Sequence, residues 1–279
     1  MALSVKRCLT VLMVLFLSAC GGGSDPVDDG ASSPEVRCGT LGLTPKIFNG
    51  TECAESAGSP VVPLVIFASS FDPEAGLCSG TVLSPTRVLT AAHCIPNDAR
   101  AVGVWGADGV VWASGWVVHP DFREESTGFF NDAAVVTVTA SLRNASMALL
   151  LGEPAAVGQS VFIAGWGRTD SAGAFAFDVD PMDPTLTNVG DVVVGNASLS
   201  FVNQDHLGFV FSGRNSDTCQ GDSGGPLYRD MNGRKGLLGI TSFGSTAICG
   251  GNGRSVYTNI QTPAVLDFIL EHAPDAQTF

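Results

Sequence analysis

Short runs of β-branched and aromatic residues recur from about Ile47 onward, and Gly, Pro and Asp turns separate them. Each run has the length and composition of a strand. Because long segments with 3.6-residue periodicity are scarce, the pattern predicts an all-β chain folded as an antiparallel barrel or sandwich. The expected strand regions are 61–67, 80–91, 101–105, 110–118, 133–139, 161–166, 192–194, 207–213, 237–244 and 256–260.

One segment has the pattern of a helix, residues 263–273. It begins with proline, which suits the first helical position, and its apolar residues repeat at helical spacing. The face expected to be buried contains Val265, Leu266, Ile269 and Leu270.

The first twenty residues combine a basic start, an apolar run and a small-residue end, which is typical of an export leader. The run is too short to span a membrane comfortably. Its end, Leu17-Ser18-Ala19-Cys20, resembles the bacterial lipobox, which implies a leader of residues 1–19 and a lipid on Cys20 that anchors the protein in the cell envelope. A plain secreted leader with an incidental cysteine is the alternative. Residues 20–37 would then be a flexible tether, because they are rich in Gly, Ser, Pro and Asp.

Removal of the leader leaves 12 basic against 27 acidic residues, a formal charge of −15. So acidic a surface argues against nucleic acid as a partner and favours cationic substrates. Membrane contact is expected through the N-terminal lipid alone.

The chain contains eight cysteines, of which Cys8 leaves with the leader and Cys20 is the lipidation candidate. Six remain, which fits three disulfides in an oxidising compartment. No CxxC spacing supports a zinc site.

The segment 217-DTCQGDSGGP-226 surrounds Ser223 with glycines and acidic residues. A serine hydroxyl becomes a nucleophile only when a base takes its proton and a third group orients that base. Among four histidines, His93 ends an apolar strand and adjoins Cys94.

Three segments in order, 89-LTAAHC-94, 131-NDAAVVTV-138 and 219-CQGDSGGP-226, resemble the chymotrypsin/trypsin-like serine proteases. Weaker matches extend the resemblance over residues 46–270. They are 46-KIFNG-50, 118-VHPDF-122, 165-GWGRT-169, 242-SFG-244 and 256-VYTN-259.

The resemblance implies two six-stranded antiparallel β-barrels with a C-terminal helix, forming one protease domain over residues 47–279. It also implies that Ser223 is the nucleophile, that His93 is the general base, and that Asp132 orients the imidazole. The backbone N–H groups of Gly221 and Ser223 would form the oxyanion hole.

The family pattern pairs Cys78 with Cys94 and Cys219 with Cys249, which leaves Cys38 with Cys53. It further implies a propeptide of residues 38–46. Cleavage between Lys46 and Ile47 would free an ammonium group that pairs with buried Asp222. Phe48 and Asn49 depart from the usual Val-Gly. If Cys38 and Cys53 are bonded, the cut protein stays attached to its lipid.

The resemblance also assigns a substrate-binding cleft. Asp217 would lie at the floor of the primary specificity pocket and select Arg or Lys. Gly244 would keep one wall open, whereas Ser255, where trypsins have glycine, would narrow the other. Ser242 and Phe243, with Gly244, would pair with the substrate backbone.

Two alternatives to an endopeptidase remain. One is a catalytically silent binding protein or adhesin with this fold. The other is an esterase, although the order His93, Asp132, Ser223 conflicts with that of α/β-hydrolases. No metal or other cofactor is expected; a calcium site in the acidic segment 170–191 is less expected than solvated turns. The expected partners are protein or peptide substrates, and the expected state is a monomer.

Overall fold

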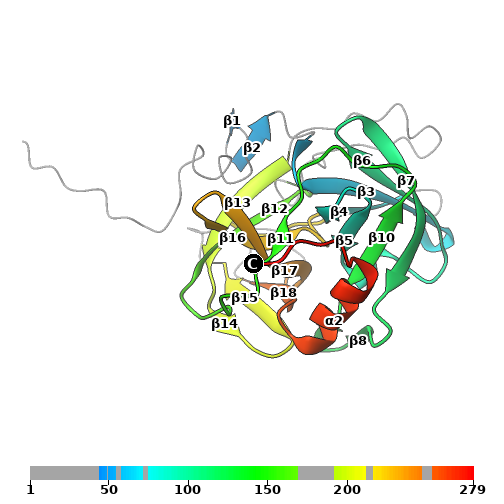
Figure 1. The fold of residues 1–279 in the computed structure, drawn as a ribbon. Helices are drawn as coiled ribbons and strands as arrows, with labels where there is room; N and C mark the ends of the chain where they lie inside the picture. The colour runs from blue at the N-terminus through cyan, green and yellow to red at the C-terminus, as the bar shows by residue number, and fades with distance from the viewer. Residues whose placement is uncertain are drawn as a thin grey trace, which may run out of the picture.

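The computed structural model describes residues 44–48, 50–54, 58–71, 75–168, 192–211, 216–246 and 253–279, with the backbone alone for 44–48, 50–54, 192 and 193. The fold is mostly β, and it divides into a closed barrel and a second, larger sheet (Figure 1). The predicted fold class is therefore confirmed.

The first half of the chain forms a closed barrel in which β10 pairs with both β5 and β7. Its apolar runs turn Val, Leu and Ile inward, and the strand β3 is almost entirely buried. The strands, in barrel order, are β10 (Ala134–Val138), β5 (Arg87–Thr90), β4 (Gly76–Ser84), β3 (Val61–Ala68), β6 (Ala99–Gly106) and β7 (Gly109–Val118).

The second half forms a ten-stranded sheet around a separate core that includes Phe209, Leu238 and Tyr257. The family resemblance implied six strands for this half, and β1 and β2 lengthen one end of the sheet. In order, its strands are β1 (Thr44–Phe48), β2 (Gly50–Ala54), β13 (Val192–Ser198), β12 (Ser160–Gly165), β16 (Pro226–Met231), β17 (Arg234–Gly244), β18 (Arg254–Asn259), β15 (His206–Val210) and β14 (Phe201–Val202), with β11 (Ala148–Leu149) beside β17.

Short elements complete the described fold. Strands β8 (Arg123–Glu125) and β9 (Gly128–Phe130) form a separate two-stranded sheet, and η2 (Ser69–Phe71) and η3 (Ala92–Cys94) are single 3₁₀ turns. Every expected strand region contains a strand, but region 80–91 is split into β4 and β5 by a turn at Pro85 and Thr86.

The C-terminal helix α2 (Pro263–His272) confirms the predicted helix. Its buried residues are Val265, Phe268 and Ile269, so Phe268 takes the place expected for Leu266 and Leu270, which are only partly buried. The helix packs against the first barrel (Figure 1), since the ring of His119 lies 4.8 Å from that of Phe268. The C-terminal segment therefore ties the two halves together.

Candidate active site

His93 and Asp132, which are 39 residues apart in the sequence, meet at the end of the first barrel. The ring Nδ1 of His93 lies 2.8 Å from Oδ2 of Asp132, and the backbone N–H of His93 donates to Oδ1 at 2.9 Å. A carboxylate only accepts, so Nδ1 carries the hydrogen and Nε2 is left to accept one in the neutral ring. The Asp132 side chain is fully buried, whereas that of His93 is 21% exposed.

The second sheet also holds Asp132. Ser242, at the end of β17, donates its hydroxyl to Oδ2 at 2.5 Å, and Thr258 of β18 donates to the backbone carbonyl at 3.2 Å. The carboxylate thus accepts from Ser242 and from the backbone N–H of His93, which offsets its burial, whereas Thr258 holds the backbone of Asp132. Asn131, the preceding residue, has a left-handed φ of 50°, a conformation that asparagine tolerates better than most residues.

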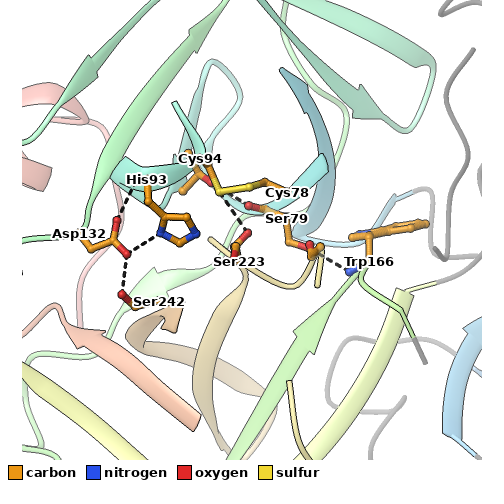
Figure 2. Close-up of a disulfide and its surroundings, with 10 residues drawn as sticks. Cys78, Ser79, His93, Cys94, Asp132, Trp166, Ser223 and Ser242 are labelled. Atoms are coloured by element: carbon orange, nitrogen blue, oxygen red, sulfur yellow. Dashed lines mark hydrogen bonds and ion pairs between the residues drawn. A yellow bond between two sulfur atoms is a disulfide. The ribbon is translucent and has the colours of Figure 1, made fainter. Parts of the chain in front are cut away.

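Ser223 lies beside the His93 ring, which Figure 2 shows between Asp132 and Ser223. Its loop is fixed to the first barrel through Ser79 of β4. The backbone N–H of Ser79 donates to the Ser223 carbonyl at 2.8 Å, and the Ser79 hydroxyl donates to the Gly221 carbonyl at 2.8 Å. The loop that contains Ser223 belongs to the second half of the chain, and these hydrogen bonds attach it to the first barrel.

Gly224 is required by packing. It has a φ of 83°, and a Cβ there would collide with the hydroxyl of Thr90 and the carbonyl of Ser79. Glycine allows both the conformation and the close approach. Gly224 therefore allows the loop with Ser223 to pack closely against the barrel.

The disulfide between Cys78 and Cys94 is present, as predicted, and closes a loop next to His93 (Figure 2). Cys219 is also disulfide-bonded. Its expected partner Cys249 lies outside the described residues, as do Cys20 and Cys38.

A pocket of about 170 Å³ opens beside Ser223 and is lined by Asp217, Ser242, Phe243 and Gly244, among others. The Asp217 carboxylate Oδ1 accepts from the backbone N–H of Thr218 at 2.9 Å. It also accepts a short hydrogen bond from the hydroxyl of buried Ser255. One oxygen of Asp217 is therefore already engaged by two donors of the protein.

Asp222 is half-buried as a residue, but backbone encloses its carboxylate. Oδ1 accepts from the N–H of Gly167 at 2.9 Å, and Oδ2 accepts from that of Cys219 at 2.8 Å. A Cβ at Gly165 or Gly167 would collide with the carboxyl group. Burial raises the pKa of Asp222 to about 6, although these two hydrogen bonds act in the opposite direction.

Lys46 and Ile47, the predicted cleavage junction, lie within the continuous strand β1. Lys46 pairs with Glu52 and Ile47 pairs with Thr51 in an antiparallel hairpin with β2. The predicted junction therefore lies within a paired strand.

Sequence patterns gave no reason to select Phe129 or Ser79. Phe129 of β9 stacks on the His93 ring, with centroids 4.9 Å apart and planes at 26°. Phe129 comes just before the NDAAVV segment, and Ser79 follows a predicted disulfide cysteine. Their closeness in sequence to motif residues could have marked both as candidates, but it does not reveal which side chains they contact.

Within the described ranges, no group of three or more His, Cys, Asp or Glu side chains is arranged to hold a metal ion. Nor does any helix in those ranges have the length and apolar content needed to cross a membrane. The acidic segment 170–191 lies outside the described residues.

Comparison with known proteins identifies the family. The chain is similar to human kallikrein-12, with 31% identity over 78% of this chain and 87% of that protein. It is also similar to the CLIP domain-containing serine protease B4 of Anopheles gambiae (29% identity, 66% of this chain), of whose length it spans 59%. A trypsin of Saccharopolyspora erythraea matches at 31% identity over 60% of this chain and 75% of that protein. The family model described as trypsin matches residues 47–269, and the chain therefore belongs to the trypsin family of serine proteases.

Proposed function

We propose that the protein is a serine endopeptidase that hydrolyses peptide bonds through an acyl-enzyme. The observation that carries this proposal is the buried Asp132 bonded to Nδ1 of His93, with Ser223 next to the same ring. Ser223 Oγ attacks the substrate carbonyl carbon while its proton passes to Nε2 of His93. The imidazolium then donates that proton to the leaving amine, and water hydrolyses the ester by the reverse route.

The negative charge that develops on the carbonyl oxygen needs donors. Among the described residues, the backbone N–H groups of Gly221 and Ser223 donate to no protein group, so both remain available. The Asp132 carboxylate accepts from the backbone N–H of His93 and from the hydroxyl of Ser242, and it stabilises the imidazolium.

The proposed specificity is cleavage after Arg or Lys. Asp217 supplies a carboxylate in the pocket, and Gly244 leaves its wall without a side chain. The Ser255 hydroxyl competes with the substrate cation for Asp217. We expect a trypsin-like preference with a reduced rate relative to a pocket that has glycine at this place.

Activation by cleavage at Lys46–Ile47 fits the state of Asp222. In the uncut chain its carboxylate is enclosed and has a raised pKa. The freed ammonium of Ile47 would supply the missing counter-charge and order the loop that contains Ser223. Ile47 must first leave the β1–β2 hairpin, because it is paired there with Thr51.

The N-terminal sequence supports export, and its Leu-Ser-Ala-Cys end supports a lipid on Cys20 in a bacterial envelope, with plain secretion as the alternative. A Cys38–Cys53 disulfide would keep the activated domain attached to that anchor. Reducing and non-reducing gels of the cut protein test this link, since only reduction should release the N-terminal piece.

The central test is labelling by an alkyl fluorophosphonate, which reacts with activated serines. Protein cleaved at Lys46–Ile47 should be labelled, and Ser223→Ala should not. Equal labelling of the two proteins, or none of the cleaved wild type, would refute the endopeptidase and favour a catalytically silent binding protein. A panel of anilides with Arg, Lys, Phe or Leu before the scissile bond tests specificity; faster cleavage after Phe or Leu would contradict the proposed role of Asp217.

A further inference from the structure

His206 is a nearly buried histidine outside the proposed triad. It begins β15 in the second sheet and is 9% exposed. Its backbone is firmly held, because its N–H donates to Oδ1 of Asn203 at 2.8 Å and it pairs with Thr258 of β18. The imidazole therefore projects from a rigid position.

The imidazole reaches across to the hairpin of β8 and β9. Its Nε2 lies 2.7 Å from the backbone carbonyl of Phe129. A carbonyl only accepts, so Nε2 carries a hydrogen and donates it. The same ring meets Phe243 edge-on, with centroids 5.6 Å apart, and lies 5.1 Å from the ring of Phe130.

That hairpin needs an external anchor. Its strands have three residues each, and an isolated two-stranded hairpin is at best marginally stable in water. Gly128 lies so close to Phe243 of β17 that a Cβ would overlap the phenyl ring, and Gly128 has a φ of 135°. The hairpin thus docks on the second sheet through Gly128 and through the His206 hydrogen bond.

The other side of the hairpin touches His93. Phe129 stacks on the His93 ring at 4.9 Å and meets Phe243 edge-on at 5.9 Å. The hydrogen bond to Asp132 fixes Nδ1 of His93, but it still allows the ring to rotate about that contact. The residue stacked on the ring face limits this rotation. Phe129 therefore covers one face of the His93 ring and restricts its rotation.

We propose that His206 is a positioning residue: by holding the Phe129 carbonyl, it keeps Phe129 stacked on His93 and so keeps Nε2 directed at Ser223. This inference rests on the proposed function, in which His93 is the base. In this inference a residue of the second sheet, His206, orients a base, His93, that belongs to the first half of the chain.

The test compares His206→Leu, which removes the donor, with His206→Gln, whose amide donates at similar reach. His272→Gln, on α2, is the matched control. The first readout is the rate constant for fluorophosphonate labelling of Ser223 in the cleaved protein, which needs the base and does not depend on the specificity pocket. We expect about a tenfold loss in His206→Leu. Recovery to within about threefold is expected in His206→Gln, and no change in the control.

The second readout does not require activity. The chain has four histidines, so the imidazole signals in an NMR spectrum of histidine-labelled protein can be assigned by substitution. The His93 protons should shift in His206→Leu, because the ring current of Phe129 moves away, and should stay in place in the control. If His206→Leu does not fold, His206→Asn, one methylene shorter than Gln, replaces it.

Unchanged labelling and unchanged His93 signals in the donor-deficient variant would overturn the inference. So would a folded His206→Gln that is as slow as His206→Leu. Absence of labelling in the wild type would instead refute the proposed function, and the NMR comparison would still decide whether His206 positions the ring.

Discussion

The enclosed carboxylate of Asp222 makes the stability of the uncut protein depend on pH. The pKa of this carboxyl is about 6 in the folded chain, whereas an aspartate exposed to water has a pKa of 3.8. In the folded state the group holds its proton up to a higher pH than in the unfolded state. Its contribution to stability is therefore fully present below about pH 4, and it is lost as the pH rises through 6.

The size of this effect follows from the shift. A difference of about two pKa units corresponds to about 3 kcal/mol in the free energy of unfolding. That is a large share of the 5–15 kcal/mol, roughly, by which a domain is stable. Asp222→Asn cannot ionise, so the substitution should remove this fall in stability between pH 4 and pH 7.5.

Urea unfolding of the uncut protein, with its disulfides intact, measures the effect. Both proteins carry Ser223→Ala, which prevents self-cleavage, and exposed Asp267→Asn is the control. The two proteins share all their other titratable groups, so the difference between the curves reports mainly on Asp222. A difference that stays constant from pH 4 to pH 7.5 would refute the reasoning.

Cleavage at Lys46–Ile47 should abolish this dependence. The ammonium of Ile47 beside Asp222 would favour the charged carboxylate and lower its pKa. The same comparison on cleaved protein should then give no fall in stability between pH 4 and pH 7.5. A persisting fall of about 3 kcal/mol would show that the two groups do not meet.

Three further outcomes are expected. Ser255→Gly should raise kcat/KM on arginine anilides about tenfold, because it removes one of the two donors on Oδ1 of Asp217 and so a competitor for the substrate cation; an unchanged rate contradicts this. Replacing Cys78 and Cys94 by alanine should lower the free energy of unfolding by about 2–4 kcal/mol in urea, and a loss under about 1 kcal/mol would be too small. Phe268→Ala should lower the free energy of unfolding by about 3–5 kcal/mol, because it leaves a cavity under α2. In the same urea experiments, Asp267→Ala at an exposed position should change it little.

Relations between neighbours in the chain determined what could be predicted. Short runs of β-branched and aromatic residues between turns located the strands, because such residues favour extended, buried segments. The Pro263 start and helical spacing located α2, and three ordered motifs selected His93, Asp132 and Ser223. Strands too short to show a pattern, such as β8 and β9, escaped prediction.

Only the tertiary structure decided which distant side chains touch. Ser255 meets Asp217 across 38 residues, and His206 meets the carbonyl of Phe129 across 77. Such contacts depend on the closure of the barrel and the register of the second sheet, which local sequence does not encode residue by residue. The motifs thus determined which chemical groups the chain offers. Packing between the two halves decided how each group is oriented and how its charge is compensated, because burial and hydrogen bonding depend on the folded surroundings.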